Sequence, residues 1–279
     1  MRIRYGFRLA LECAAPTPAS FAVDVHPSRH EDIIVESPLF IRTKGGPKLT
    51  TTSALDMFGN SRRRTVLPAG RTEIEHHGVI RDSGLHDTIN MAARQVPVEQ
   101  LPEEVMTFLF GSRYCETDLL SAEAWNRFGQ VPEGWARVQA ICDFVHDNVE
   151  FGYNHADCTR SAASVLQGGR GVCRDFAHLA ITLCRAMNIP ARYCTGYLGD
   201  IGVPRDPAPM DFSAWFEAYL DGRWYSFDAR HNIPRIGRVV MARGRDAIDV
   251  PIVNTFGPHI LANFEVWTDE MQAADRVAA

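Results

Sequence analysis

The fold of this chain is decided by the stretch RGVCRDFAHL, residues 170–179. Apolar residues recur at helical spacing from there, so a helix is predicted from about residue 172 to residue 187, where Asn188 can end it and Pro190 bars its continuation. Cys173 therefore lies in the first turn of this helix. Backbone N–H groups and the positive end of a helix stabilise a thiolate at such a position, and the thiolate is the reactive form of cysteine. The stretch thus indicates a cysteine nucleophile.

A predicted hairpin supplies the second half of the pattern. Asp221 and Gly222 form a strong two-residue turn signal, and the register that they set places Trp215 opposite Asp228. Residue 213 then lies diagonal to Asp228 on the same face, about 7–8 Å away or somewhat less between Cβ atoms. A histidine there could donate a hydrogen bond to Asp228 and face the thiol. The position holds Ser213, which is too short to bridge that distance and is no base near neutral pH.

The histidines elsewhere in the chain are not expected to replace this base. The same register places His231 opposite Phe212, on the other face of the hairpin, unless a bulge shifts the pairing. Asp175 and His178 follow Cys173 in the helix but point away from its face, so they are predicted to anchor the helix. A histidine from elsewhere in the chain, such as His178, His231 or His259, within reach of Cys173 in the folded protein would be the feature that separates an enzyme from a silent relative.

Three stretches together resemble the core of the bacterial transglutaminase-like superfamily of cysteine peptidases, and they are residues 170–179, 190–197 and 211–228. The resemblance implies a papain-like α+β scaffold that carries a Cys–His–Asp triad. Carried over by position, Cys173 would be the nucleophile and Asp228 would orient the base. Ser213 stands at the usual position of the catalytic histidine. That departure bears on activity and leaves the expected fold unchanged.

The first part of the chain has the pattern of β-structure. Apolar residues alternate with polar or small ones from Ile3 to Leu9, which is typical of a half-buried strand. Further short runs bounded by turn residues follow, and residues 56–60 have the composition of a tight turn. This part is similar to the domain that often precedes the transglutaminase-like core. We therefore predict an α+β protein with an antiparallel β-domain of sandwich type over residues 1–100 and a papain-like, transglutaminase-like core over residues 101–279.

Composition argues against several classes of function. The chain has 279 residues and a net charge of −5, so neither nucleic acid nor an anionic membrane is expected as a partner. No run of about 18 apolar residues occurs, so no membrane-spanning helix is expected. The seven cysteines are scattered without a CxxC pair, which favours a reduced cytoplasmic setting. No cofactor is expected, and no metal either, because the cluster of ligand types at residues 155–158 has no partner cluster.

Two functions fit these observations. The first is a cysteine-dependent hydrolase or acyltransferase that acts on an amide, thioester or ester of a peptide or protein, without the usual histidine. The second is a catalytically silent relative that binds peptide or protein in the same groove. Cys173 and Asp228 are both present, which favours the enzyme. Replacement of a histidine by engineering or by sequence error also stays open.

The rate that is lost without a catalytic histidine limits which substrates the protein could act on. Loss of a positioned acid–base costs roughly 10²- to 10⁴-fold in rate. Ser213 cannot protonate a leaving amine, which cleavage of an amide requires. Ordinary proteolysis is therefore disfavoured, whereas attack on an activated substrate such as a thioester is less affected.

Overall fold

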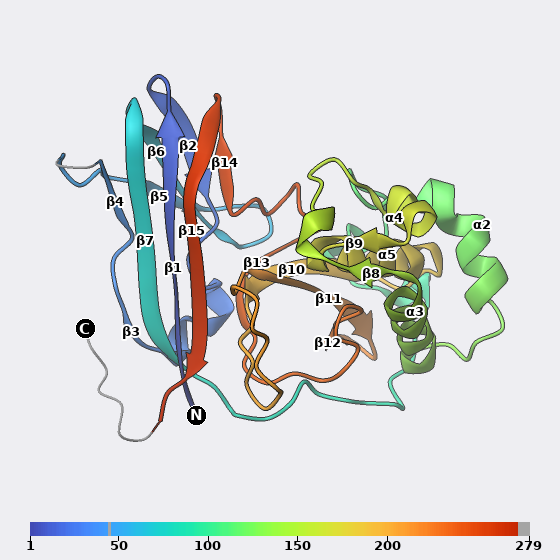
Figure 1. Ribbon diagram of the computed structural model, residues 1–279. Coiled ribbons are helices and arrows are strands. Elements are labelled where there is room, and N and C mark those ends of the chain that lie inside the picture. Colours follow the sequence, from blue (N-terminus) through green and yellow to red (C-terminus); the bar gives the residue numbers. More distant parts are fainter. Residues whose placement is uncertain (44–45, 273–279) are drawn as a thin grey trace.

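Two antiparallel sheets pack face to face in the part of the molecule drawn on the left in Figure 1. The computed structural model describes residues 1–43 and 46–272. One sheet has the order β15-β1-β7-β3 with β4 also paired to β7, and the other has the order β14-β2-β6-β5. The strands of the first sheet are β1 (Arg2–Cys13), β3 (Ile33–Glu36), β4 (Phe40–Thr43), β7 (Gly70–Arg81) and β15 (His259–Glu270). Those of the second are β2 (Thr17–Phe21), β5 (Thr52–Leu55), β6 (Ser61–Leu67) and β14 (Val253–Thr255).

The apolar face of β1 fills the space between these two sheets. Successive side chains of a strand point to opposite faces, so the alternating residues of β1 share one side. Ile3, Tyr5 and Phe7 are fully buried there and Leu9 is 1% exposed. The predicted first strand and the sandwich type of the domain are thereby confirmed.

The two last strands belong to this sandwich and not to the core in which the sequence-based division at residue 100 had placed them. β15 pairs antiparallel with β1 from Ile3 opposite Glu270 to Cys13 opposite His259, and β14 pairs with β2. The physical reason is that β1 would otherwise expose a long row of unpaired backbone groups at the edge of the sheet. Such pairing joins segments that are far apart in the chain.

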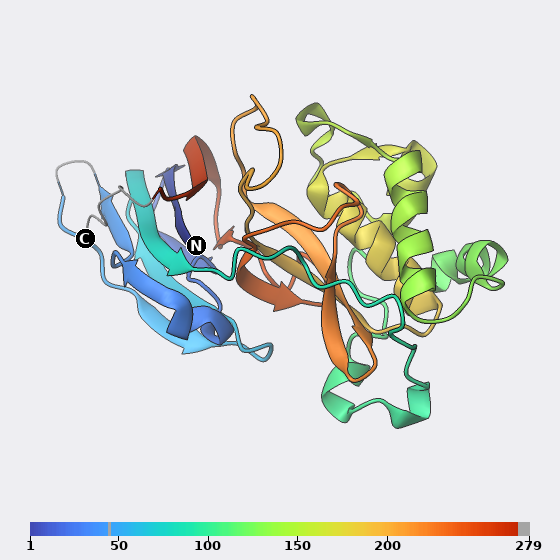
Figure 2. The same ribbon diagram turned by 90° about the horizontal axis from the view of Figure 1, so that it is seen from below.

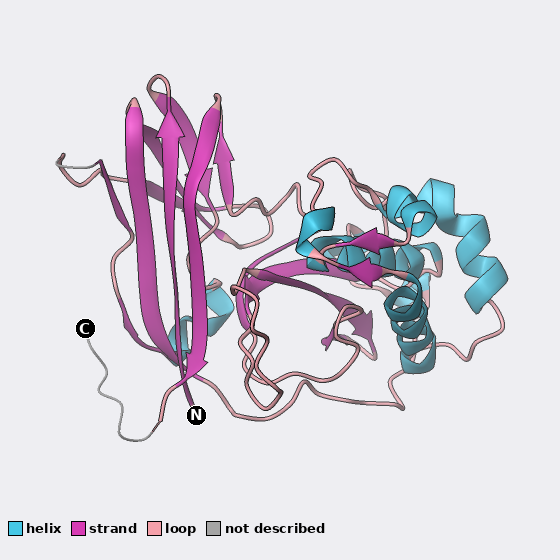
Figure 3. Cartoon of the chain, viewed as in Figure 1, coloured by secondary structure: helices cyan, strands magenta, loops and turns pink. Residues whose placement is uncertain are grey.

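The core has an antiparallel sheet of its own, of order β12-β11-β10-β13, covered on one face by helices (Figure 3). Its strands are β10 (Ala191–Tyr197), β11 (Ser213–Leu220), β12 (Arg223–Phe227) and β13 (Val239–Gly244). The helices are α1 (Glu103–Met106), α2 (Thr117–Phe128), α3 (Trp135–Asn148), α4 (Ala162–Gly168) and α5 (Cys173–Ala186). Short elements complete the chain: the parallel pair β8 (Glu150–Phe151) and β9 (Arg170–Gly171), and the 3-10 turns η1 (Pro27–Asp32), η2 (Val98–Gln100) and η3 (Tyr153–His155).

Helix α5 is the centre of the core. It packs against β10 and β11 on one side and against α2, α3 and α4 on the other. Its bounds agree with the predicted helix, and Asn188 takes the left-handed conformation just beyond it, with φ of 62°. The hairpin is also confirmed, because Leu220 pairs with Arg223 and the loop residues Asp221 and Gly222 both have positive φ.

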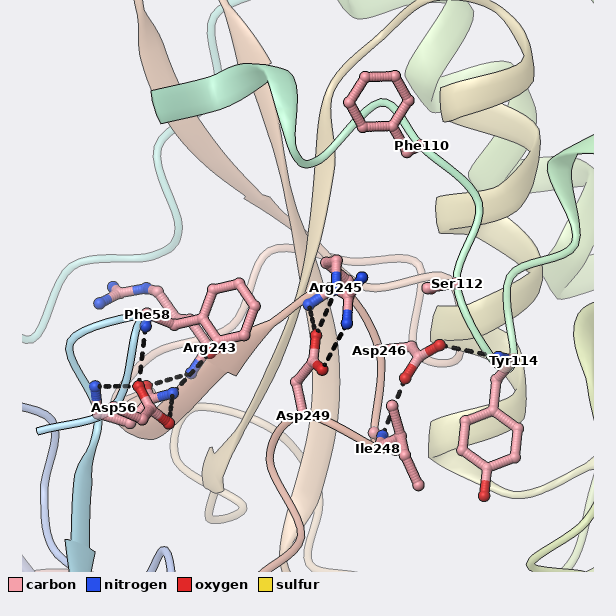
Figure 4. A network of polar contacts seen from close by, with 12 residues as sticks. Asp56, Phe58, Phe110, Ser112, Tyr114, Arg243, Arg245, Asp246, Ile248 and Asp249 are labelled. Atoms are coloured by element: carbon pink, nitrogen blue, oxygen red, sulfur yellow. Dashed lines mark hydrogen bonds and ion pairs between the residues drawn. The ribbon is translucent and has the colours of Figure 1, made fainter. Parts of the chain in front are cut away.

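The sandwich and the core meet at the turn of residues 56–60, part of the polar network in Figure 4. The Asp56 carboxylate accepts hydrogen bonds from the backbone N–H groups of Phe58 and Asn60, and Gly59 takes the positive φ that closes the turn. Asn60 is fully buried and uses its side-chain amide to bond both backbone groups of Arg243 in β13, at 2.7 and 2.8 Å. The turn thus docks the sandwich onto the sheet of the core.

A second connection between the two parts is the extended segment of residues 82–97, which crosses from β7 to the helices in Figure 2. Among the described residues, none of the helices combines the length and the apolar character that crossing a membrane requires.

Candidate functional site

Helix α5 begins at Cys173 because Asp175 holds its first turn. The buried Asp175 carboxylate accepts a hydrogen bond from the Val172 backbone N–H at 2.9 Å and pairs with Arg174 at 3.1 Å. A side chain at Gly171 would lie 2.6 Å from the Asp175 Cβ, so only glycine lets the strand approach the helix this closely. The predicted anchoring role of Asp175 is confirmed. Gly171 and Asp175 of the RGVCRD stretch together position Cys173 at the start of α5.

Cys173 is half-buried and opens onto a cavity of about 580 Å³ between the core and the sandwich. The β10–β11 connection, residues 198–212, forms one wall and is the golden loop that stands between the two parts in Figure 2. Strand β15 contributes Trp267 and Asp269. Strand β15 of the sandwich therefore completes a cavity whose cysteine comes from the core.

The surroundings of the Cys173 thiol oppose its ionisation. Burial, followed by the negative charge of Asp211 and to a smaller extent that of Asp228, raises the pKa of the Cys173 thiol to about 11. The Arg230 guanidinium and the Ala214 backbone N–H act in the opposite direction without prevailing. The stabilisation that the helix end offers to a thiolate is thus opposed by the cost of removing that thiolate from water.

Ser213 lies where the sequence placed it, on the wall of the same cavity as Cys173. It begins β11, is 7% exposed, and pairs with Gly196 of β10. Its backbone carbonyl accepts a hydrogen bond from the Thr195 hydroxyl at 3.2 Å. Within the described residues, no hydrogen bond joins the Ser213 side chain to Asp228 or to any other group.

Asp228 is buried just beyond the end of β12, and its carboxylate is fully engaged by other partners. One oxygen accepts hydrogen bonds from His231 Nδ1 at 2.9 Å and from Arg238 Nη2 at 3.1 Å. The other oxygen accepts from the backbone N–H groups of Arg230 and His231, both at 3.1 Å. Burial alone would raise the pKa of Asp228, but the His231 hydrogen bond and the Arg238 charge outweigh it and hold that pKa well below its usual range.

His231 is the residue that reasoning from the sequence placed wrongly. That reasoning continued the strand to residue 231, whereas β12 ends at Phe227. The chain then turns, with the Asn232 N–H bonded to the Asp228 carbonyl at 2.8 Å and Asn232 at φ of 52°. The turn brings the His231 ring back onto Asp228 and into the cavity that Cys173 lines. The usable signal was the pair of Asp228 and Asn232, since both residue types favour tight turns.

The other two candidate histidines lie away from the cavity. His178 is fully buried, accepts a hydrogen bond from the Ala247 backbone N–H at 3.1 Å, and stacks on Tyr114. Burial, with smaller contributions from nearby arginine charges, lowers the pKa of His178 well below its ordinary value, so its ring is neutral. His259 begins β15 and contacts Thr255. His178 packs within the core, as predicted.

The part of the chain that the structure describes contains no group of three or more histidine, cysteine, aspartate or glutamate residues arranged to hold a metal ion. The ligand types of residues 155–158 do not converge: the Asp157 carboxylate accepts hydrogen bonds from Thr159. None of the seven cysteines forms a disulfide.

Asp211→Asn is expected to lower the pKa of the Cys173 thiol, because it removes the charge that opposes the thiolate most strongly after burial itself. More thiolate at pH 8 means faster alkylation by iodoacetamide, by about tenfold for each unit of pKa. The rate is followed on the Cys173 peptide by mass spectrometry, because Cys158 is exposed and also reacts. Arg230→Gln is the matched control and should slow alkylation. Equal rates in both variants would contradict this account.

The chain is similar to known proteins along most of its length. Residues 124–229 match the model of the transglutaminase-like superfamily. A solved structure from Cytophaga hutchinsonii, described as a "putative cysteine protease", is 30% identical, covers 99% of this chain and 93% of its own, and superposes with a TM-score of 0.81.

Curated relatives match over a shorter range. A Mycobacterium leprae protein is 34% identical over 97 residues, which are 32% of this chain and 33% of that protein. A Mycobacterium tuberculosis protein is 34% identical over 113 residues, which are 37% of this chain and 36% of that protein. The match thus spans about a third of the length of these relatives. Because the Cytophaga hutchinsonii structure is similar over the whole fold and the family model covers both Cys173 and Asp228, this chain belongs to the transglutaminase-like superfamily.

Proposed function

We propose that this protein is a cysteine-dependent acyltransferase or hydrolase that acts on an amide, thioester or ester of a peptide or protein. The observation that carries the proposal is the placement of Cys173, which is the first residue of α5 and opens onto the cavity of about 580 Å³. A structural cysteine in a tightly packed core has no such access, as the fully buried Cys115 and Cys184 illustrate. A cavity of this size accommodates several residues of an extended peptide.

The reaction begins when the Cys173 sulfur attacks the carbonyl carbon of the substrate. A carbon–sulfur bond forms, the thiol proton passes to a base, and the bond from the carbonyl to the leaving nitrogen, oxygen or sulfur breaks as that atom takes a proton. The product is a thioester on Cys173. Water or an amine then attacks this thioester, gives an acid or an amide, and returns the proton to the sulfur.

Groups around the thiol support attack in spite of its raised pKa. Arg230 and the Ala214 N–H both favour the thiolate. Their stabilisation of the thiolate would increase once substrate displaces water from the cavity, because a lower dielectric strengthens interactions with a forming charge. We also propose a reduced cytoplasmic setting, since a nucleophilic thiol works only while it is reduced.

The silent binding module remains the second candidate because of two specific observations. The pKa of Cys173 of about 11 leaves the resting thiol protonated at neutral pH, and Ser213 offers no base from β11. A relative with this arrangement would bind a peptide in the cavity and leave it unchanged.

A covalent-trapping experiment separates the two candidates. The protein is incubated with a peptide thioester and with a peptide aryl ester, and the adduct is located by mass spectrometry. We expect an acyl group on Cys173 and release of product, both abolished in Cys173→Ala. Cys158→Ala is the matched control, because Cys158 is exposed and does not line the cavity, and it should behave as the unmodified protein. Saturable peptide binding without an adduct on Cys173 would replace the enzyme by the binding module.

A further inference from the structure

We propose that His231, oriented by Asp228, is the general acid–base for Cys173 and takes the role that Ser213 cannot fill. The inference rests on the proposed cysteine-dependent chemistry. It assigns the proton transfer to a residue of the loop after β12, in place of the strand position at which the superfamily resemblance puts the histidine.

The hydrogen bond between His231 and Asp228 sets the tautomer of the ring. His231 Nδ1 lies 2.9 Å from an Asp228 oxygen. Because the pKa of Asp228 is held well below its usual range, this carboxylate is ionised and can only accept. Nδ1 therefore carries the proton in the neutral ring, and Nε2 carries the lone pair that a general base needs.

The free nitrogen of His231 is available to the cavity. The His231 side chain is 24% exposed and lines the same cavity as Cys173 and Ser213. Within residues 1–43 and 46–272, Nε2 makes no hydrogen bond. A serine side chain is much smaller than a histidine side chain, so position 213 leaves cavity space that a histidine there would occupy.

The support behind His231 is rigid. Arg238 is buried and bonds both Asp228, at 3.1 Å, and Asp87, at 2.9 Å. The turn itself is closed by the bond from the Asn232 N–H to the Asp228 carbonyl, and the Asn232 side chain donates to Asp143 in α3 at 2.8 Å. A base held by an ionised carboxylate on a fixed turn meets the requirement that a catalytic group keep its orientation.

With His231 as the general acid–base, every proton in the reaction has a donor and an acceptor. Nε2 accepts the Cys173 thiol proton as the sulfur attacks the carbonyl carbon, and the imidazolium is stabilised by Asp228. The imidazolium then gives the same proton to the leaving nitrogen or oxygen as the substrate bond breaks. In the second half, Nε2 takes a proton from the attacking water or amine and returns it to the Cys173 sulfur.

The test is His231→Asn, in which the asparagine amide can keep the hydrogen bond to Asp228 while Nε2 is lost. We expect turnover of an ester or amide substrate to fall by roughly 10²- to 10⁴-fold. A thioester should lose less in acylation, because its leaving group departs without needing a proton and only the removal of the thiol proton is affected. Ser213→His in the His231→Asn background should restore at least part of the rate, since it offers a base from β11.

Three controls keep the outcomes distinct. His259→Asn should be unchanged, because His259 lies outside the cavity, and Cys173→Ala should be inactive. Thermal unfolding checks that His231→Asn is folded, and His231→Gln together with rescue by added imidazole replaces it if it is not. Unchanged turnover in folded His231→Asn or His231→Gln, with Cys173→Ala inactive, would overturn the role of His231 and leave the proposed function standing. Absence of any acyl adduct in the unmodified protein would instead remove the proposed function.

Discussion

Gly196→Ala is expected to cost roughly 3 kcal/mol of the free energy of unfolding, at the upper end of what overpacking of a core usually costs. A Cβ at this position would lie 2.1 Å from the Val239 carbonyl oxygen and 3.0 Å from the Met241 nitrogen. Both are backbone atoms of β13, so no side chain can rotate away to make room. β10 is also held on its other side by β11, where Gly196 pairs with Ser213. β10 and the edge strand β13 would have to separate.

Urea denaturation measures this effect, and Gly168→Ala is its matched control. Gly168 ends α4 without a positive φ, and a methyl group added there would have no other atom within 4 Å. Alanine is favoured over glycine in helices by up to about 1 kcal/mol, so the control should keep or slightly raise stability. The same loss in both variants would show that the contact with β13 is not what makes Gly196 necessary. A weakened Gly196→Ala protein should also alkylate Cys173 differently, because the cavity wall at Ser213 shifts with β10.

Asn60→Ala is expected to cost about 2–6 kcal/mol, because it leaves two backbone groups of Arg243 without their partners, at about 1–3 kcal/mol for each group. Asn60 is fully buried and donates to the Arg243 carbonyl at 2.7 Å while accepting from the Arg243 N–H at 2.8 Å. It also donates to Asp56 at 3.0 Å. Alanine provides none of these bonds and is too short to exclude water from the joint between the sandwich and β13.

Differential scanning calorimetry follows the loss, with Asn263→Ala as control. Asn263 lies on the exposed side of β15 and its side chain bonds Glu265, at 3.3 Å, so its replacement should change stability by no more than about 0.5 kcal/mol. If the joint also couples the two parts, Asn60→Ala should broaden the unfolding transition, since the sandwich and the core would then unfold separately. A single sharp transition at the original temperature would count against the proposed joint.

Much of the fold follows from local patterns in the sequence. The period of apolar residues predicted α5, and Asp221 with Gly222 predicted the hairpin and its register. Both elements depend on interactions between residues close in the chain, so local spacing carries the information. The turn at residues 56–60 was also predicted, but its contact with β13 of the core was not. Nothing in the spacing of Asn60 indicates that its amide will bond a strand whose sequence comes much later.

Some residues of the candidate site were also predicted from the sequence, and others were not. Cys173 was predicted at the start of a helix, and residue 213 at the position from which a histidine would face its thiol. Cys173 and Ser213 both line one cavity. His231 was misplaced because the end of β12 is set by how Asp228 is satisfied. Arg238, which holds Asp228, is itself held by Asp87 from the segment that joins the sandwich to the core. A register counted along a hairpin cannot include such a partner.

The sequence by itself indicated the superfamily, the place of Cys173 at the start of a helix and the absence of a histidine at residue 213, because each follows from residues close together in the chain. Only the tertiary structure decided three other features: the return of β14 and β15 to the sandwich, the raised pKa of Cys173, and the pairing of His231 with Asp228. Strand partners, desolvation and the closure of a cavity depend on which distant segments come to lie against a residue. Those contacts exist only once the chain has folded.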